Sequence, residues 1–394
     1  MWVNGFLAMP LAVLALPVYM YLPSYYAEQF GLSLTAIGLV LFGVRLSDVI
    51  TDAWVGRLSD SVSMGRAQQM LLASFGLILG VFLIFNPPIW AQSVWGLAVL
   101  SFGMFLAWTW VNVPYQAMLV GLASASERAR WSMVREGLSI VAVLVLMASP
   151  VALDIKPTDP DFFAGLSGVF AMVMGGLMWI YIRRFGSSRH VKIPQVSYRE
   201  LRGAVPGVFR IMPSYFINNL ANALPAVLFV MFVTQILGLE SQVGILLLSY
   251  FLAGVLALPL WLAWAKRKGA LVAWRHSMIL ASLSFACVLL LDEGDFWGFW
   301  CVCVVSGLSL GVDLALPSAH QADLAEQANQ ALDKDVSATV FGLWGLLVKL
   351  SMALAVGLAL PLVEYFGTSA LWLMYAVLPI FLKLTAVGLL LRGR

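Results

Sequence analysis

Long apolar segments separated by short polar turns fill most of the chain. Each is close to the roughly 20 residues that an α-helix needs to cross the hydrocarbon core of a bilayer. Because that core offers no water, each segment must satisfy its own backbone hydrogen bonds, which favours helices. The pattern predicts an all-α integral membrane protein with about twelve transmembrane helices, over residues 6–27, 34–56, 67–87, 93–120, 131–153, 162–183, 207–236, 242–264, 270–291, 295–318, 337–363 and 368–391.

Lysine and arginine gather in every second turn, whereas the turns between are short and acidic and hold Lys156 and little else. Cytoplasmic loops of membrane proteins carry an excess of these two residues. We therefore expect the basic side and both termini to face the cytoplasm, with the chain in a bacterial inner (plasma) membrane. The basic positions are Arg57, Arg66, Arg128, Arg130, Arg183, Arg184, Arg189, Lys192, Arg199, Arg202, Lys266, Arg267, Lys268, Arg275, Lys334, Arg392 and Arg394.

The longest polar stretch, residues 183–203, divides the chain into nearly equal parts. A short basic turn follows the second span of each part, at "GRLSDSVSMGR" and "LPLWLAWAKRKGA", which indicates a faint internal repeat. Two such halves around a central cavity are a common transporter plan. We predict a six-helix bundle over 1–184, a cytoplasmic linker over 185–206 and a second six-helix bundle over 207–394.

Composition agrees with lipid as the main solvent. Hydrophobic residues make up 61% of the 394 residues, charged ones only 11%, and the mean hydropathy is +0.91. The net charge of +3 is too small to indicate nucleic acid as a partner. The three cysteines and three histidines show no metal-ligand spacing, so no cofactor and no metal beyond a coupling ion is expected. We expect a small-molecule substrate, surrounding lipid and a monomer.

The second span carries ionisable side chains, which are costly inside a membrane and therefore mark function. Its "VRLSDVITD" stretch supplies Arg45, Asp48, Thr51 and Asp52. Asp48 and Asp52 are four residues apart and share one helix face. Two carboxylates and a hydroxyl suit Na⁺, and equally a proton held between like charges. The alternative is an ion-pair network around Arg45 that only holds helices together.

Polar side chains in other spans are candidates to bind a substrate. Interhelical hydrogen bonding is the alternative for the asparagines, and a distant ion pair is the alternative for Lys349. We expect Lys383 to be structural, with its amine reaching the cytoplasmic end of the last helix. The substrate-binding candidates are Asn112, Gln116, Arg135, Asn218, Asn222, Asp313 and Lys349, and Thr109 joins the cation candidates Asp48, Thr51 and Asp52.

The turn "GRLSDSVSMGR" after the second span is a candidate gate. It holds Gly56, Asp60, Gly65 and Arg66, and Arg45 lies about three turns of helix before it. A carboxylate and cations at helix ends can hold one conformation by pairing with a neighbouring helix, and the glycines permit a tight turn. The alternative is an ordinary solvated turn.

Catalytic and nucleotide-binding motifs are missing from the sequence, including a phosphate-binding glycine-rich loop and a nucleophile elbow. We therefore expect no enzyme activity and no use of ATP. Any uphill transport must draw on an ion gradient.

The order of these motifs resembles the major facilitator superfamily, and more closely its glycoside–pentoside–hexuronide:cation symporter (melibiose permease-like) group. The matching stretches are "YMYLPSYYAEQFGLS", "RLSDVITD", the 56–66 turn, "VNVPYQAM", "ERARWSMVRE", "LPSAHQAD" and "GLWGLLVKL". The resemblance implies a major facilitator fold in two bundles. It also implies a cation site at Asp48, Thr51, Asp52 and Thr109, a functional arginine near Arg135 and a functional lysine at Lys349.

The chain departs from this group where the group binds sugar. Leu11 and Ala12 stand where the group has a Lys-Asp pair, Asn112 and Gln116 replace an acidic residue and a tryptophan, and Ala53 replaces a proline. A carboxylate binds sugar hydroxyls more strongly than an amide does. The departures therefore favour an anionic or amphipathic substrate over a simple galactoside.

The sequence thus favours a secondary active transporter that couples Na⁺ or H⁺ to symport of a small organic solute, sugar-like or anionic, by alternating access. Two alternatives remain. One is a lipid or lysophospholipid transporter on the same scaffold. The other is a membrane sensor or assembly protein that does not transport.

Overall fold

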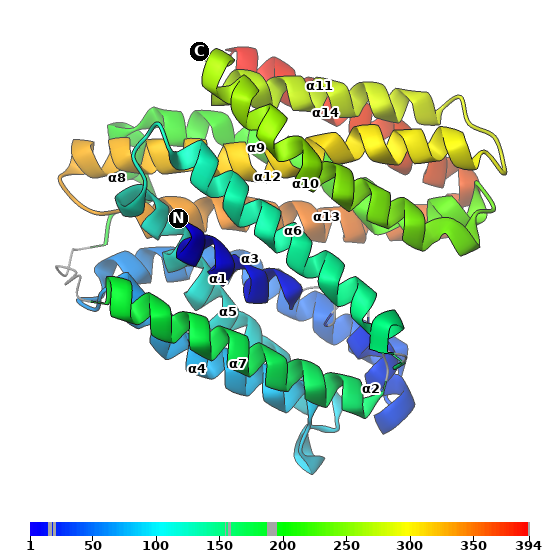
Figure 1. Cartoon of the computed structure of the whole chain (residues 1–394), viewed down its shortest axis with the longest axis horizontal. Coiled ribbons are helices and arrows are strands. Elements are labelled where there is room, and N and C mark those ends of the chain that lie inside the picture. Colours follow the sequence, from blue (N-terminus) through cyan, green and yellow to red (C-terminus); the bar gives the residue numbers. More distant parts are fainter. Residues whose placement is uncertain (15–17, 19–20, 154, 157–158, 187–194, 393–394) are drawn as a thin grey trace. The chain divides into compact units, whose positions relative to one another are not determined.

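The computed structural model describes residues 1–14, 18, 21–153, 155–156, 159–186 and 195–392. Its regular elements are helices throughout these ranges (Figure 1). Arg189 and Lys192 of the basic linker, and Arg394, lie outside the described residues. The chain forms two compact units, which are Met1–Ser124 with Val134–Tyr198 and Ala325–Leu346, and Ala125–Met133 with Arg199–Leu324 and Leu347–Arg394.

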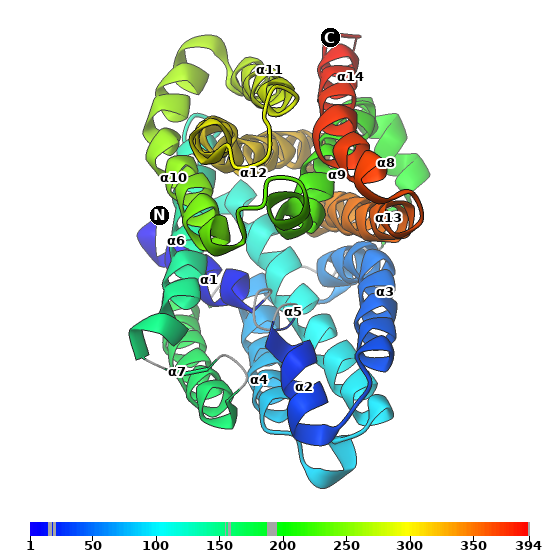
Figure 2. The same ribbon diagram turned by 90° about the vertical axis from the view of Figure 1, so that its right-hand side faces the viewer.

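The described residues of the first half form eight α-helices. They are α1 (Trp2–Val13), α2 (Leu22–Phe30), α3 (Leu34–Ser61), α4 (Arg66–Phe85), α5 (Val94–Leu122), α6 (Arg128–Leu153), α7 (Pro160–Phe185) and the short α8 (Tyr198–Ala204), with a 3₁₀ turn, η2 (Ile89–Ala91). Within the first unit α5 packs against α3 and α4, and α7 packs against α1 and α4 (Figure 2).

The described residues of the second half supply six α-helices. They are α9 (Pro206–Gln235), α10 (Val243–Lys268), α11 (Ala270–Val288), α12 (Phe296–Leu332), α13 (Ser337–Trp372) and α14 (Leu378–Arg392), with a 3₁₀ turn, η3 (Glu240–Gln242), and a π-helical turn, η4 (Leu373–Val377). Within the second unit α14 packs against α9 and α11, and α10 packs against α11.

Nine described helical stretches are long and apolar enough to span a membrane. The last of them, Ser337–Arg392, contains a break at Gly367, where φ is 62° and ψ is −140°. The helix α3 is not among these nine, although its 28 residues are long enough to cross. Together with α1 and α2 these helices are consistent with the expected twelve spans.

The predicted first span, 6–27, is covered by α1 and by α2, which begins at Leu22. Residues 15–17 and 19–20 of this span lie outside the described residues. Pro23 lies in the first turn of α2, where its missing N–H costs nothing. The tenth span also runs on to Leu332, because its polar end is rich in alanine and glutamine, which favour helix outside the membrane.

An apolar stripe on α4 faces outward. Leu72, Phe75, Leu79 and Phe82 recur every three or four residues and are all exposed. A continuous apolar face of this kind is stable when lipid covers it. At the C-terminal end of α4, two tyrosines of α2 bond to backbone carbonyls that the helix itself leaves without a partner. The Tyr25 hydroxyl donates to the carbonyl of Phe85 and the Tyr26 hydroxyl donates to that of Ile84.

Aromatic side chains form the centre of the second unit. Phe232 of α9 stacks on Tyr375 of η4 with ring centroids 4.1 Å apart and planes 10° apart. Phe299 of α12 lies beside both rings, at 5.9 Å and 6.3 Å. These contacts join three helices around one apolar cluster and fix the π-helical turn against α9.

Candidate functional site

The predicted carboxylate pair lies inside the first unit. Asp48 and Asp52 are 2% and 3% exposed on α3, one helical turn apart. The helix starts with a side-chain cap, because the hydroxyl of Ser33 accepts the backbone N–H of Ala36 at 3.2 Å. The carboxylates follow four turns later, deep in the helix, where ionisable groups are expensive unless they are partnered or neutralised.

Thr109 of α5 is the predicted cation residue that the fold brings to this pair. Its hydroxyl is fully buried and donates to Oδ1 of Asp52 at 3.0 Å. Thr51 is half-buried, and its hydroxyl instead donates to the backbone carbonyl of Asp48 at 3.2 Å. The structure therefore joins Asp52 to Thr109 directly, while the Thr51 hydroxyl bonds to its own helix.

Two glycines of α13 pack beside Asp52, and the sequence reasoning did not select either of them. A Cβ atom added to Gly345 would lie 2.5 Å from Oδ2 of Asp52. One added to Gly342 would clash with the backbone carbonyl of Asp52. The missing side chains let the first turns of α13 approach the Asp52 carboxylate closely. The signal in the sequence is the spacing of the glycines in "FGLWGLL".

Arg45 lies on α3 close to one helical turn before Asp48. It is half-buried, and its guanidinium carbon lies 5.9 Å from the ring centroid of Phe105 on α5. This distance is within the range of a cation–π contact.

The predicted substrate residues of the first unit are spread over α5 and α6. Asn112 and Gln116 are half-buried on α5. Arg135 is buried on α6, where its Nε and a terminal nitrogen donate to Oε1 of Glu136 at 2.8 Å and 2.5 Å. The neighbouring carboxylate thus balances the charge of Arg135. Lys349 on α13, 6% exposed, belongs to the second unit.

The predicted gate residues meet the first turn of α13. Oδ1 of Asp60 accepts the N–H of Ala338 at 3.1 Å, and Oδ2 accepts the N–H and the hydroxyl of Thr339 at 2.6 Å and 2.7 Å. These are among the N–H groups that the start of a helix leaves without an internal partner. An anion at that position also gains from the helix dipole.

Arg66 completes this arrangement. Its guanidinium donates to Asp60 at 2.9 Å and to Asp335 at 2.7 Å. Asp335 also accepts the N–H and the hydroxyl of Ser337, at 3.2 Å and 2.8 Å. We call Asp60, Arg66, Asp335 and the first turn of α13 the Asp60 cluster.

Burial alone would raise the pKa of Asp335, but the charge and hydrogen bond of Arg66 outweigh it and lower that pKa.

The two predicted gate glycines have different roles. A Cβ atom on Gly56 would clash with the backbone carbonyl of Ala338, so Gly56 permits close contact between α3 and α13. Gly65 is the N-cap of α4, and its N–H donates to the side chain of Gln68 at 3.3 Å.

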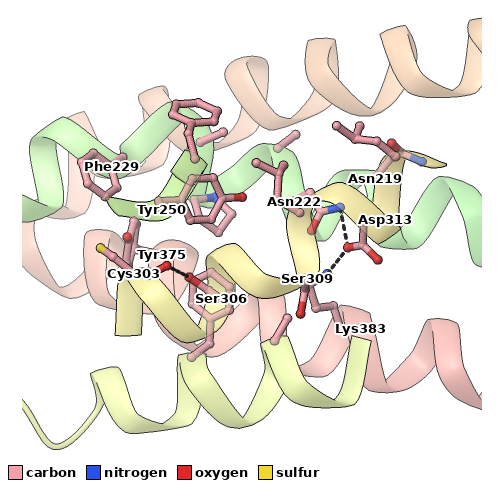
Figure 3. Close-up of a pocket in the computed structure, with 18 of the residues that line it drawn as sticks. Asn219, Asn222, Phe229, Tyr250, Cys303, Ser306, Ser309, Asp313, Tyr375 and Lys383 are labelled. Atoms are coloured by element: carbon pink, nitrogen blue, oxygen red, sulfur yellow. Dashed lines mark hydrogen bonds and ion pairs between the residues drawn. The ribbon is translucent and has the colours of Figure 1, made fainter. Parts of the chain in front are cut away.

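A second charged cluster lies inside the second unit (Figure 3). Nζ of Lys383 donates to Oδ2 of Asp313 at 3.0 Å and to Oδ1 of Asn218 at 3.1 Å. The Asp313 carboxylate also accepts from Asn222 at 3.1 Å and from the hydroxyl of Ser277 at 3.0 Å. The predicted residues Asn218, Asn222 and Asp313 are therefore brought together.

Lys383 corrects the sequence-based prediction. It was expected to extend to the cytoplasmic end of the last helix, but it is 1% exposed and paired with Asp313. The carboxylate comes from α12, 70 residues earlier in the chain, so a pattern within one helix could not indicate it.

A further buried polar network was also missed. The hydroxyl of Tyr115 donates to the backbone carbonyl of Asn4 at 2.5 Å, and the hydroxyl of Tyr181 donates to the side-chain oxygen of Asn4 at 3.0 Å.

An ion pair in the second unit was missed as well, because Arg128 pairs with Asp323 at 2.7 Å. Among the described residues no group of three or more His, Cys, Asp or Glu side chains could hold a metal ion.

The helical membrane fold and its buried charged groups fit the class of membrane transporters, and comparison with known families supports this class. The family model described as "MFS/sugar transport protein" matches residues 3–392, and the chain belongs to that family. The resemblance found in the sequence motifs is thereby confirmed.

Two curated relatives come from Escherichia coli (strain K12). The chain is 24% identical over 366 residues to the glucuronide carrier protein homolog, covering 85% of this chain and 76% of the relative. It is 30% identical over 167 residues to a putative glycoside/cation symporter, covering 40% of this chain and 36% of the relative.

Solved structures share the fold. The Escherichia coli fucose:proton symporter matches with a TM-score of 0.72 and 10% identity, over 100% of this chain and 98% of that one. A bacterial homologue of the iron transporter ferroportin also gives a TM-score of 0.72, with 13% identity over 99% and 98% of the two chains. These relatives and neighbours are transporters rather than enzymes, as the sequence predicted.

Proposed function

We propose that this protein couples entry of Na⁺ or H⁺ to symport of a small organic solute, sugar-like or anionic, by alternating access. The observation that carries the proposal is the buried pair Asp48 and Asp52 with the Thr109 hydroxyl on Asp52. Carboxylate and hydroxyl oxygens are ligands for a hard cation, and two nearby carboxylates raise the affinity of one for a proton.

The energetic argument follows from burial. Two carboxylates that are almost inaccessible within a membrane protein are expensive as a pair of anions. A bound cation or proton removes part of that charge, so the loaded and empty forms of α3 differ in free energy. A conformational equilibrium that responds to this difference couples the ion gradient to transport.

The substrate assignment is supported by the relatives' names, which refer to glucuronide and glycosides. Arg135 and Lys349 are the cationic candidates, and Asn112 and Gln116 are neutral ones on α5. In the second unit, Asn218, Asn222 and Asp313 are the proposed substrate residues. An anionic group on the solute would find cations in this set, whereas hydroxyl groups would bind to the amides.

The Asp60 cluster is the proposed gate, together with Arg45, Gly56 and Gly65. Its charge-assisted hydrogen bonds hold the start of α13 to α3 and α4, and they must break for these helices to separate. We propose two six-helix halves, 1–184 and 207–394, joined by a cytoplasmic linker over 185–206. The proposed location is the bacterial inner membrane with both termini in the cytoplasm, and the proposed state is a monomer.

Proteoliposomes containing the purified chain test the proposal. Uptake of a panel of glycosides, organic acids and lysolipids would be measured under an inward Na⁺ gradient, an inward proton gradient and no gradient. We expect one ion gradient to drive accumulation of a glycoside or organic acid. Asp48→Asn and Asp52→Asn should abolish uphill accumulation and spare some downhill exchange, whereas Asp333→Asn, in an exposed turn, should leave both unchanged. Accumulation at the wild-type level in both buried variants would refute ion coupling at this pair.

A further inference from the structure

The second unit contains a cavity of about 390 Å³. Ligand pockets of this kind hold most of a small molecule's surface when their volume reaches about 300 Å³. An apolar cavity of about 150 Å³ already accommodates a benzene ring. The cavity is therefore large enough for a ring together with its substituents.

One end of the cavity is aromatic (Figure 3). Phe229, Tyr250, Phe251, Phe285 and Tyr375 line it, from α9, α10, α11 and η4. Aromatic rings bind another ring by offset stacking or edge-to-face contact, with a gain beyond simple burial of apolar area. Such a lining is better suited to a flat ring than to a hydrated polar solute.

The opposite end is polar but balanced in charge. Asp313 and Lys383 line the cavity and form an ion pair of 3.0 Å, with Asn222 bonded to the same carboxylate oxygen. Asn219 and Ser309 line the same end (Figure 3). Because the carboxylate and the amine compensate one another, this end offers hydrogen bonds without a net charge. A charged group entering it would lose its water without an opposite charge to replace it.

We infer that this cavity binds an uncharged ring-bearing group with hydroxyl or ether oxygens beside the ring. The ring lies among the aromatic side chains, and its oxygens reach the Asp313–Lys383 end. This inference rests on the proposed function, because it assigns the cavity to an apolar part of the transported solute. The solute is accordingly amphipathic, with a flat aromatic ring that a simple sugar lacks.

Some of the side chains that line the cavity are also exposed. They include Asn222 and Ala226 of α9 and Leu314 of α12. A large side chain at position 226 would therefore fill space that the ring needs. Ala263 of α10 is also exposed but does not line the cavity, so it offers a matched control.

Calorimetric titration of the purified full-length protein in detergent tests the inference. The probes are phenyl β-D-glucoside, methyl β-D-glucoside and phenol, which carry the ring and the sugar together, the sugar alone and the ring alone. We expect the phenyl glucoside to bind at least about ten-fold more tightly than the methyl glucoside, an advantage of the size that one well-buried ring provides. Ala226→Trp should remove that advantage and Ala263→Trp should keep it.

The phenol titration shows whether the site binds free ring compounds or only a ring that belongs to a larger solute. Either result supports a ring site. Phenol that binds alone and competes with the phenyl glucoside indicates a site for free ring compounds. Phenol that does not bind indicates that the ring must belong to a larger solute. Equal affinity for the two glucosides, or a ring advantage that persists in Ala226→Trp and in a second filling variant, Ala281→Leu, overturns the inference.

The same titration separates this inference from ion coupling. It needs no membrane gradient, and it is repeated with Asp52→Asn in sodium chloride and in choline chloride. A ring advantage that survives Asp52→Asn while uphill transport is lost supports the cavity and the ion site independently. Uphill transport without any ring advantage would retain the proposed function and refute the assignment of the cavity.

Discussion

Thr109 on α5 donates a hydrogen bond of 3.0 Å to Asp52 on α3, and both side chains are buried. The bond joins two helices of the first unit and orients one carboxylate oxygen. The hydroxyl is also positioned to contribute an oxygen to any ion held by that carboxylate.

Replacing Thr109 by valine should weaken ion coupling. A buried hydrogen bond to a charged group contributes about 1.5–3 kcal/mol, and its loss corresponds to a ten-fold or greater change in affinity. We expect the half-saturating concentration of the coupling ion to rise about ten-fold in Thr109→Val. Ion-dependent uptake in proteoliposomes measures this value, and Thr109→Ser, which keeps the hydroxyl, should stay near the wild type. Equal ion dependence in the serine and valine variants would contradict a role for the hydroxyl.

Gly345→Ala should impair transport through steric contact. The new methyl group would lie 2.5 Å from Oδ2 of Asp52, so the carboxylate or α13 must shift. We expect at least a several-fold loss of ion-driven uptake with little loss of protein in the membrane. Gly357→Ala on the same helix is the matched control, because a Cβ atom there meets no atom within 4 Å. Wild-type uptake in Gly345→Ala would show that transport does not need the close approach of α13 to Asp52.

The Asp60 cluster should contribute measurably to thermal stability. Asp60 accepts three hydrogen bonds from the first turn of α13 and pairs with Arg66. In Asp60→Asn the charge disappears, and we expect a loss of about 2 kcal/mol, which lowers the unfolding midpoint by a few degrees. Fluorescence-detected thermal unfolding in detergent measures the shift. Asp333→Asn is the control. Asp333 is exposed in the turn that precedes α13 and has a φ of 49°, which asparagine tolerates, so this variant should keep the wild-type unfolding midpoint.

The pH dependence of stability should depend on Asp335. The charge and hydrogen bond of Arg66 hold the pKa of Asp335 in the folded state below the ordinary value of an aspartate, so its ionised form stabilises the fold. That contribution is fully present above the unfolded-state value and is lost as pH falls through the lower folded-state value. The stability difference between wild type and Asp335→Asn should therefore be constant near neutral pH and shrink below about pH 4. Thermal midpoints from neutral pH to pH 3 test this, and a difference that grows with acidity would contradict it.

The ion pair in the second unit should respond differently to single and double replacement. Lys383→Met alone leaves the Asp313 carboxylate buried without its cation, a change that typically costs about 3–5 kcal/mol. Lys383→Met combined with Asp313→Leu removes both charges and should be less destabilising. Thermal unfolding of the wild type, the two single variants and the double variant measures the coupling between the two positions. A double variant no more stable than the single Lys383→Met variant would show that the pair is not compensating in this way.

The fold was largely accessible from the sequence because apolar length alone indicates a membrane helix. The predicted span 67–87 corresponds to α4 at Arg66–Phe85, and the expected gap after residue 363 contains the break at Gly367. The continuation of the tenth span to Leu332, beyond the predicted 295–318, was not anticipated. Apolar length shows that a segment can span the membrane, but it does not show how far the helix continues beyond it.

The candidate site was accessible only where its residues share one helix. Helical spacing placed Asp48 and Asp52 on one face. The carboxylate of Asp60 and the N–H of Thr339 are 279 residues apart, and a contact of that range has no local signal. Lys383 was misjudged for the same reason, since its burial depends on a partner from another helix.

The contact between α3 and α13 combines close backbone packing at glycines with polar bonds at one end. Along it, Gly56 meets Ala338 and Asp52 meets Gly342 and Gly345, so backbone faces backbone at these positions. Glycine surfaces present no side chain that would block sliding or rotation of one helix along the other there. The polar bonds of Asp60 hold one end of the contact, and they must break before the helices can separate at that end.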